Sequence, residues 1–352
     1  MAQNLFSTYK MIEAIKDIRQ SNTWLRDTFF SKNVSFDTEF VQYDVKEYAN
    51  ATVPFSAPRI GGTPVERTGF HTVSVKPAHV APYLITTAED ALKRAPGENP
   101  YQSQDPMQRS QQILADDLIS LDYDISRTEE IMCAQALLTG GIDIKGEGVD
   151  EEVLFWNTRN GGVNDPYKAL AGTSLWDAAA TAVPLQDLND AVRAISRASG
   201  VMPTHAIMGT KALDAFINCE QIQKYLDLRH IDFGNVSWPE NGTQYDGVRY
   251  WGHVGGLDIY SYESQYFDGS ADTEIFDPKK VLLGSAKADT IMCYGPNFFN
   301  EEGKGTFCSS APRVPASWYQ QMNPAGRIVQ IQSSPLPVIQ RKSCFYVLKV
   351  LG

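Results

Sequence analysis

The stretch DPMQRSQQILADDLISLDYDISRTEEIMCAQALLTGG, residues 105–141, decides the fold because it predicts one uninterrupted helix of unusual length. Asp105 is suited to accept hydrogen bonds from the first free amides, and Pro106 fits the first helical position. Gly140 and Gly141 supply a left-handed stop. An apolar stripe recurs between these ends at three- and four-residue steps: Leu114, Leu118, Leu121, Ile125 and Met132. At about 1.5 Å per residue the helix is roughly 50 Å long, well beyond the usual helix of about 10–14 residues, and a compact domain rarely needs such a rod.

Three acidic pairs also lie on this predicted helix: Asp116/Asp117, Asp122/Asp124 and Glu129/Glu130. We interpret them as its solvated face, because the sequence places no second element beside them that would make a catalytic carboxylate pair. No loop has the spacing of an EF-hand calcium site.

Composition excludes several classes of protein. The 352 residues suffice for two or three domains, and 31 Lys and Arg against 42 Asp and Glu give a net charge of −11. This acidity argues against a surface selected to hold nucleic-acid phosphates. No stretch approaches about 18 apolar residues and the N-terminus has no hydrophobic signal core, so we expect no membrane span.

The residues that usually carry catalysis or bind metals are scattered. The five histidines form no zinc-site motif, and there is no P-loop and no G-x-S-x-G turn. We interpret the triplet DFG at residues 232–234 as a turn, because no other kinase segment accompanies it. The five cysteines form no C-x-x-C pair and are predicted to be buried thiols: Cys133, Cys219, Cys293, Cys308 and Cys344. We therefore expect no catalytic residue, no cofactor and no metal site.

The segments before the long helix predict parts that need a partner. Residues 7–18 have the pattern of a short amphipathic helix, and WLRDTFF at 24–30 is too aromatic to remain in water. Alternating strands are predicted at 36–45 and 70–77. The Pro- and Gly-rich segment between them, including residues 51–69, cannot build a core, so we expect a projecting two-stranded loop.

After the helix, the pattern predicts a hairpin that turns at Gly146–Gly148, then a compact α/β unit over residues 166–284. Within this unit we expect helices at 184–199 and at 210–226, the second capped by Thr210. From about residue 290 the chain returns to β structure.

Short motifs in this order resemble a known family. Trp24–Phe30 is similar to an F-L-R-x-F-F segment, FDTEFV (36–41) to F-x-T-E-x-V, and Val75–His79 to V-K-P-x-H. DPMQRSQQILADDL resembles the start of the family's long helix, and Ile331–Leu336 its I-Q-S-x-P-L strand. Together they resemble the lambda-like major capsid protein E family of tailed bacteriophages, which has the Hong Kong 97-like fold.

The resemblance implies an α+β fold with five parts. These are an N-terminal arm at 1–45, an extended loop at 46–82, a peripheral domain at 83–165 with the spine helix at 105–139, an axial α/β domain at 166–284 and peripheral return strands at 285–352.

The same resemblance implies partners and location. The chain would assemble with itself into hexamers and pentamers of an icosahedral head that encloses double-stranded DNA and contacts it weakly. A decoration protein, a scaffold and a portal are further partners; assembly would occur in the host bacterial cytoplasm, without a membrane. We expect inter-subunit contacts from Trp24, Phe29 and Phe30, with those three buried against another chain or the spine. The loop tip is expected to add Arg59, Gly61, Gly62, Glu66 and Arg67.

The loop tip also predicts how the shell is held. Some members of this fold join subunits through an isopeptide bond between a loop lysine and an asparagine, but residues 59–67 contain no lysine. Arginine stays protonated and is a poor nucleophile, so we expect non-covalent contacts.

Two alternatives remain open: a cytosolic α/β enzyme centred on residues 166–284, or another phage structural protein such as a tail-tube subunit. A pocket with perturbed acids would favour the first, and a mostly β chain without the long helix would favour the second.

Overall fold

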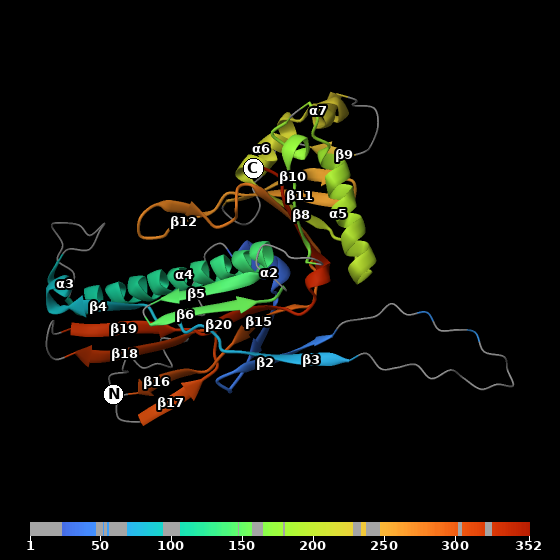
Figure 1. Cartoon of the computed structure of the whole chain (residues 1–352). Helices are drawn as coiled ribbons and strands as arrows, with labels where there is room; N and C mark the ends of the chain where they lie inside the picture. Colours follow the sequence, from blue (N-terminus) through green and yellow to red (C-terminus); the bar gives the residue numbers. More distant parts are fainter. Residues whose placement is uncertain are drawn as a thin grey trace.

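The computed structural model shows a mixed α+β chain in which one long helix lies between two groups of strands (Figure 1). The structure describes residues 23–46, 52, 55, 69–93, 106–146, 148–156, 165–178, 180–227, 234–236, 247–301, 305–320 and 326–352. The predicted helix over residues 7–18 lies outside them. The α+β class expected from the sequence is confirmed.

The long helix, α4, spans Pro106–Thr139, as the sequence predicts, and we call it the spine helix. Asp105 lies outside the described residues. At the other end Gly140 adopts a φ of +70°, and its amide donates to the Ala136 carbonyl over 3.1 Å. A Cβ there would lie only 2.0 Å from the Trp156 ring, so both the turn and the close packing require glycine.

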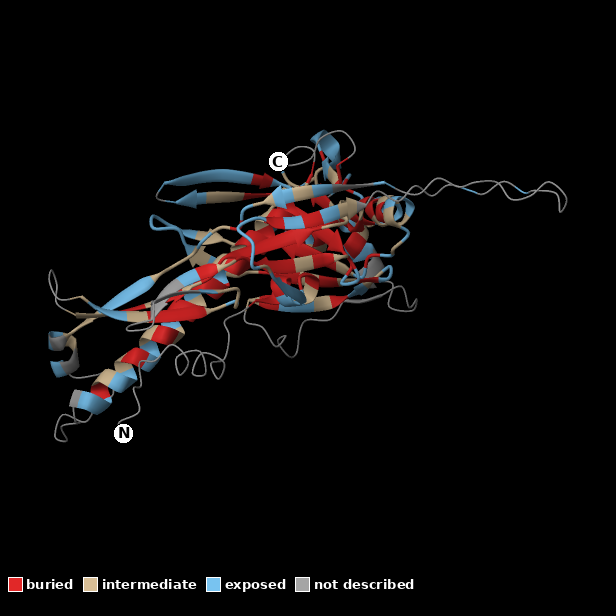
Figure 2. Ribbon diagram, turned by 90° about the horizontal axis from the view of Figure 1, so that it is seen from below, coloured by how far each residue is buried: buried red, intermediate tan, exposed pale blue. Residues whose placement is uncertain are grey.

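The apolar stripe of the spine helix packs against a three-stranded antiparallel sheet with the order β18-β19-β4, which we call the outer sheet. Its strands are β18 (Val314–Gln320), β19 (Gly326–Gln332) and β4 (Tyr83–Thr87). Leu114, Leu118, Leu121 and Ile125 form one buried cluster with Val329 and Ile331. Full burial of each such side chain contributes about 1.5–3 kcal/mol, so this contact fixes the helix to the sheet. The buried residues along the helix alternate with exposed ones (Figure 2).

The N-terminal segment belongs to the body of its own chain. Helix α2 (Trp24–Phe29) packs on the spine helix, and β1 (Lys32–Ser35) pairs in parallel with β15 (Thr290–Tyr294). Strand β20 (Pro335–Ile339) completes this sheet. The expectation that residues 1–45 form an arm reaching across neighbours therefore needs correction for residues 24–35, and stays a prediction for residues 1–22.

The predicted loop has its two strands at the base. β2 (Val41–Lys46) and β3 (Phe70–Val75) pair antiparallel, with Val41 opposite Val75 and Lys46 opposite Phe70. Between these strands only residues 52, 55 and 69 are described.

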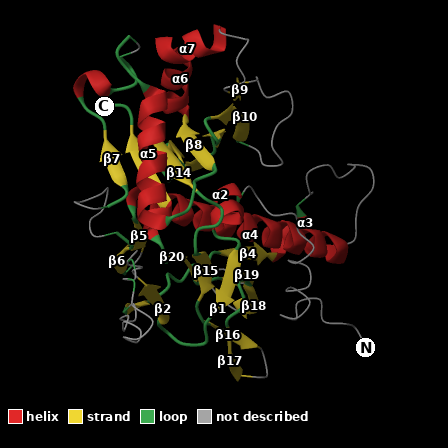
Figure 3. Ribbon diagram, turned by 90° about the vertical axis from the view of Figure 1, so that its right-hand side faces the viewer, coloured by secondary structure: helices red, strands yellow, loops and turns green. Residues whose placement is uncertain are grey.

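A seven-stranded mixed sheet forms the second group of strands, in the order β7-β21-β14-β8-β11-β10-β9. The strands are β7 (Tyr167–Ala169), β21 (Phe345–Lys349), β14 (Lys280–Gly284), β8 (His205–Gly209), β11 (Leu257–Tyr262), β10 (Val248–Val254) and β9 (Gly234–Val236). Three helices share a buried cluster with one face of this sheet: α5 (Pro184–Ser199), α6 (Thr210–Asn218) and α7 (Glu220–Asp227). Figure 3 shows α5 running across that face.

Three expectations for this unit need correction. β21, expected among the return strands at 285–352, lies inside the sheet and pairs with β14. The helix expected at 210–226 is two helices, because Cys219 is extended and its thiol donates to the Ala182 carbonyl. Thr210 is not the cap; Gly209 holds that position, and the Thr210 hydroxyl donates to Glu274 instead.

Three hairpins, a short helix and two 3₁₀ turns complete the described part of the chain. β5 (Gly141–Gly146) pairs with β6 (Val149–Leu154), confirming the predicted hairpin with its turn at 146–148. The other elements are α3 (Ala88–Leu92), the hairpin β12 (Gln265–Phe267) with β13 (Asp272–Glu274), the hairpin β16 (Asn297–Glu301) with β17 (Gly305–Ser309), and 3₁₀ turns at Gly172–Ser174 and Lys342–Cys344. Four of the five cysteines are buried as predicted, whereas Cys308 on β17 is exposed.

Candidate functional site

The acids of the spine helix are not all on its solvated face. Asp116 and Asp124 are exposed and Asp117 is half-buried, but Asp122, Glu129 and Glu130 are buried. The sequence interpretation is wrong for these three. A buried carboxylate is strongly unfavourable unless it is paired, so each one needs a partner from elsewhere in the chain.

Arg313, just before β18, is the partner of two of them. Its Nε donates to Asp122 over 2.7 Å, and its two terminal nitrogens donate to both oxygens of Glu129 over 2.6 and 3.2 Å. A further bond reaches the Ser126 hydroxyl over 3.1 Å. Although burial opposes the charge, Glu129 and Asp122 raise the pKa of Arg313. This bidentate geometry is the strong form of an ion pair.

Arg26 on α2 contacts the same glutamate, with 3.1 Å between its guanidinium and Glu129. Burial opposes this charge too, yet Glu129 raises the pKa of Arg26. We call Arg26, Asp122, Glu129, Glu130 and Arg313 the charge cluster.

Glu130 caps helix α2 from outside that helix. Its carboxylate accepts hydrogen bonds from the amides of Leu25 and Arg26 over 2.8 and 3.1 Å. The residue at the N-cap position, Thr23, makes no side-chain capping bond, so the spine helix supplies the missing acceptor. The Tyr262 hydroxyl on β11 donates to the same carboxylate over 2.9 Å. Burial raises the pKa of Glu130 to about 7, although these three donors oppose the shift.

The charge cluster thus lies where four parts of the chain meet: α2, the spine helix, β11 of the seven-stranded sheet and the start of β18. Burial raises the pKa of Glu130, but the residue is completely buried, so it can touch no substrate. The hydrogen bonds and ion pairs of the charge cluster hold these four parts of the chain together.

No local pattern in the sequence predicts these pairings. Arg313 is 184 residues beyond Glu129 and Tyr262 is 132 beyond Glu130, and neither arginine falls in a periodic pattern. The one sign in the sequence that these acids are buried is that they lie beside the apolar stripe of the same helix.

The three aromatic residues expected at subunit contacts are buried inside their own chain. Trp24, Phe29 and Phe30 are 6%, 2% and 1% exposed. Trp24 packs on Tyr260 with 5.0 Å between ring centroids, and Phe29 meets Phe345 edge to face at 5.6 Å. Of the two alternatives, the chain's own body is the one that buries them. Little of their surface remains for a contact with a second subunit.

The loop-tip residues expected at subunit contacts, Arg59, Gly61, Gly62, Glu66 and Arg67, lie outside the described residues.

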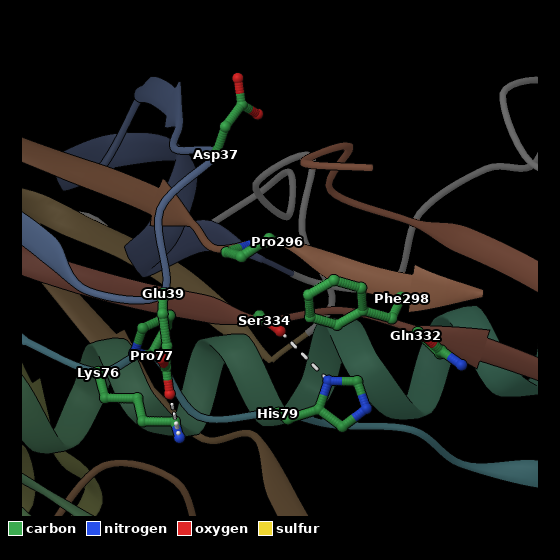
Figure 4. A pocket seen from close by; sticks show the side chains of 9 residues that line it. All are labelled: Asp37, Glu39, Lys76, Pro77, His79, Pro296, Phe298, Gln332 and Ser334. Atoms are coloured by element: carbon green, nitrogen blue, oxygen red, sulfur yellow. Dashed lines mark hydrogen bonds and ion pairs between the residues drawn. The ribbon is translucent and has the colours of Figure 1, made fainter. Parts of the chain in front are cut away.

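An open pocket of about 510 Å³ lies beside the base of the loop (Figure 4). His79 there contacts the Ser334 hydroxyl over 3.3 Å, and Lys76 pairs with Glu39 over 2.9 Å. Phe298 forms part of the wall and is exposed. The pocket therefore brings together the V-K-P-A-H and I-Q-S-S-P-L motifs, which lie 255 residues apart between His79 and Ser334. The Ser334 hydroxyl is buried and donates to the Asn297 side chain over 2.7 Å, so its proton is already engaged away from His79.

Other kinds of site find no support in the described part of the chain. It contains no group of three His, Cys, Asp or Glu side chains placed to hold a metal ion. No described helix combines the length and apolarity needed to cross a membrane.

Known proteins resemble the chain along its whole length. It is 26% identical to the major capsid protein of Enterobacteria phage P21, over 98% of this chain and 99% of that protein. The major capsid protein of Escherichia phage lambda is 23% identical over 96% of both chains. A crystal structure of a prophage capsid protein from E. coli CFT073 superposes with a TM-score of 0.72 and 17% identity, covering 98% of this chain and 99% of that one.

The family profile described as phage major capsid protein E matches residues 7–350. Because the match covers nearly the whole chain, it does not depend on any single motif. The chain therefore belongs to the phage major capsid protein E family.

Proposed function

We propose that copies of this chain assemble into hexamers and pentamers, which close into the icosahedral head of a tailed phage around double-stranded DNA. The observation that carries the proposal is the agreement of the family match with a fold that is likewise shared over its full length. The fold proposed is the Hong Kong 97-like one.

Each part of the chain has a role in this proposal. The spine helix and outer sheet form the peripheral domain. The seven-stranded sheet with α5–α7, including β21, is the axial domain that packs around the five- and six-fold axes. The loop between β2 and β3 lies over the adjacent subunit, where exposed strands and loops find the pairing that one chain lacks. We further propose that residues 1–22 reach across neighbours.

The partners beyond the shell itself follow from the same proposal. A scaffold, a portal and a decoration protein would act during or after assembly in the host bacterial cytoplasm. A net charge of −11 suits a container that holds DNA without binding it tightly.

Both alternative functions have less support. The family is one of structural capsid proteins, which argues against an enzyme centred on residues 166–284. Glu130, whose pKa burial raises to about 7, is sealed from solvent. A tail-tube subunit would be mostly β, whereas this chain is built on a helix of 34 residues.

Negative-stain electron microscopy of the purified full chain tests the proposal. We expect closed shells of uniform size. Tubes would favour the tail-tube alternative, and a chain that stays monomeric at high concentration would contradict assembly.

Denaturing gel electrophoresis of the particles tests how they are held. Because the loop tip lacks lysine, we expect one band near the 39.1 kDa chain mass after boiling without reductant. A ladder of larger species that survives boiling would show covalent links.

A further inference from the structure

The hairpin of β12 and β13 carries an exposed aromatic side chain outside the body of the chain. Phe267, the last residue of β12, is 66% exposed. The preceding Tyr266 lines an open groove beside the spine helix, and side chains alternate along a strand, so Phe267 lies on the opposite face of the hairpin. Figure 1 shows this hairpin, in orange, projecting from one side of the seven-stranded sheet. A large aromatic side chain held in this way suits a contact with another surface.

The tip of this hairpin is ordered within the single chain. The Asp268 carboxylate accepts hydrogen bonds from the amides of Ser270 and Ala271 over 2.8 and 2.9 Å. The Asp268 amide in turn donates to the Ala271 carbonyl, and Gly269 between them adopts a φ of +97°. The two amides hold the pKa of Asp268 well below its ordinary value, so this side chain is charged at neutral pH. A tip that is already ordered loses little conformational entropy when it binds.

A small pocket lies where α5 meets the 3₁₀ turn Lys342–Cys344 and β21. Its volume is about 190 Å³. Most of its lining residues are apolar or aromatic: Pro166, Ala194, Ile195, Ala198, Phe345 and Tyr346. An apolar cavity of about 150 Å³ holds a benzene ring, so this pocket has room for one phenyl side chain.

The charges of the hairpin and of the pocket rim are complementary. Residues 265–274 contain three acidic residues and no basic one: Asp268, Asp272 and Glu274. At the rim, Lys342 keeps a third of its side chain in solvent while its partner, Asp165, is buried. Arg197 is exposed on the turn of α5 that lines the pocket. In a chain with a net charge of −11, a rim with basic side chains favours the acidic tip over other surfaces.

The hairpin and the pocket belong to opposite sides of the seven-stranded sheet. Tyr262 and Phe276, which flank the hairpin in the sequence, lie in the buried cluster on one face of the sheet, whereas α5 shares the cluster on the other face. Figure 1 shows the hairpin and α5 on opposite sides, and Figure 3, viewed from the side of α5, shows that helix in front of the sheet. The tip of a chain therefore cannot enter the pocket of the same chain. Complementary patches on opposite sides of a subunit make a head-to-tail contact, which closes into a ring when successive copies are rotated.

We propose that Phe267 of one subunit inserts into the pocket between α5, the turn at 342–344 and β21 of the next subunit around a ring. This inference rests on the proposed function and names the two surfaces through which neighbouring axial domains join within one hexamer or pentamer. Burial of the phenyl ring supplies the apolar part of the contact, and the acidic tip and basic rim orient it.

Chemical cross-linking of assembled full chains tests the contact. The test chain carries Ala271→Cys at the hairpin tip and Ala198→Cys at the pocket, both exposed positions, together with Cys308→Ser; the other four cysteines are buried. Because every chain then has one thiol on each side of the contact, a short bismaleimide should join successive subunits around the ring. On a denaturing gel we expect a ladder of multiples of the 39.1 kDa chain mass that ends at five and six chains.

The matched control moves the second thiol along the same helix. Asn189→Cys replaces Ala198→Cys at another exposed position of α5, about 13 Å away along the helix axis and outside the pocket lining. We expect single chains and no ladder from this control.

A second measurement uses assembly itself. Phe267→Asp should abolish closed shells in negative-stain images while the subunit keeps its circular dichroism spectrum, since most of the Phe267 side chain is exposed in the single chain. Phe267→Leu keeps an apolar side chain at the tip and should still form shells.

The outcomes separate the two proposals. Shells without a ladder, an equal ladder through Asn189→Cys, or normal shells from Phe267→Asp would overturn this inference and leave the proposed function standing. Failure of the unsubstituted chain to form shells would overturn the proposed function, and this inference with it.

Discussion

The spine helix makes two neighbouring contacts of opposite character. Toward the outer sheet it buries four aliphatic side chains against Val329 and Ile331. At the charge cluster it buries three carboxylates. Arg313 and Arg26 pair with Asp122 and Glu129, and Glu130 accepts hydrogen bonds from the amides of α2 and from Tyr262. The apolar contact depends on area removed from water and tolerates changes of shape. The charged contact depends on each partner being present, because a missing partner leaves a buried charge.

The largest expected effect breaks the apolar contact. Leu118→Asp places an unpaired carboxylate among aliphatic side chains, at a cost of several kcal/mol. We expect insoluble or unfolded protein, judged by soluble yield and circular dichroism. Asp116→Leu, at an exposed position two residues away, is the control and should stay folded. A soluble, normally folded Leu118→Asp subunit would show that the stripe does not face a core.

Removing one partner from the charge cluster should lower the free energy of unfolding slightly less than Leu118→Asp does. Arg313→Met leaves Asp122 and Glu129 buried with fewer donors, which corresponds to about 3–5 kcal/mol lost from the free energy of unfolding. Urea denaturation of the subunit measures this loss in the free energy of unfolding.

Arg127→Met is the matched control, because Arg127 pairs with Asp124 on the solvated side of the same helix. An exposed pair is worth about 0–1 kcal/mol, so this variant should unfold near the unsubstituted midpoint. Equal losses in the two variants would remove the distinction between buried and exposed pairs.

The smallest expected effect is on how the stability of the subunit depends on pH. Burial raises the pKa of Glu130 from its ordinary value of 4.5 to about 7, so the native state binds this proton more tightly than the unfolded chain does. The resulting stabilisation is fully present below pH 4.5 and is lost as the pH rises through 7. Its full size is roughly 3 kcal/mol.

Glu130→Gln removes this titration and should flatten that part of the curve of unfolding free energy against pH between 5 and about 7.5. Glu151→Gln, on the exposed part of β6, should leave the curve unchanged. An unaltered slope in Glu130→Gln would assign the pH dependence to other groups.

The aromatic segment shows that a correct local interpretation can leave the partner open. The aromatic side chains of WLRDTFF are expected to be buried against another chain or the spine, and α4, β11 and β21 of their own chain bury them. Phe29→Ser with Phe30→Ser would therefore destabilise the subunit itself instead of blocking only its assembly. Large apolar side chains predict burial, and they carry no information about which surface buries them.

What the sequence determined by itself was local. The bounds of the spine helix, its apolar stripe, the hairpin at 146–148 and the strands at the base of the loop follow from periodicity and from glycine and proline, which act within a few residues. The tertiary structure alone decided that Asp122, Glu129 and Glu130 are buried and that β21 joins the seven-stranded sheet. The physical reason is distance along the chain: an arginine 191 residues after Asp122 makes that burial possible, and no local pattern records such a pairing.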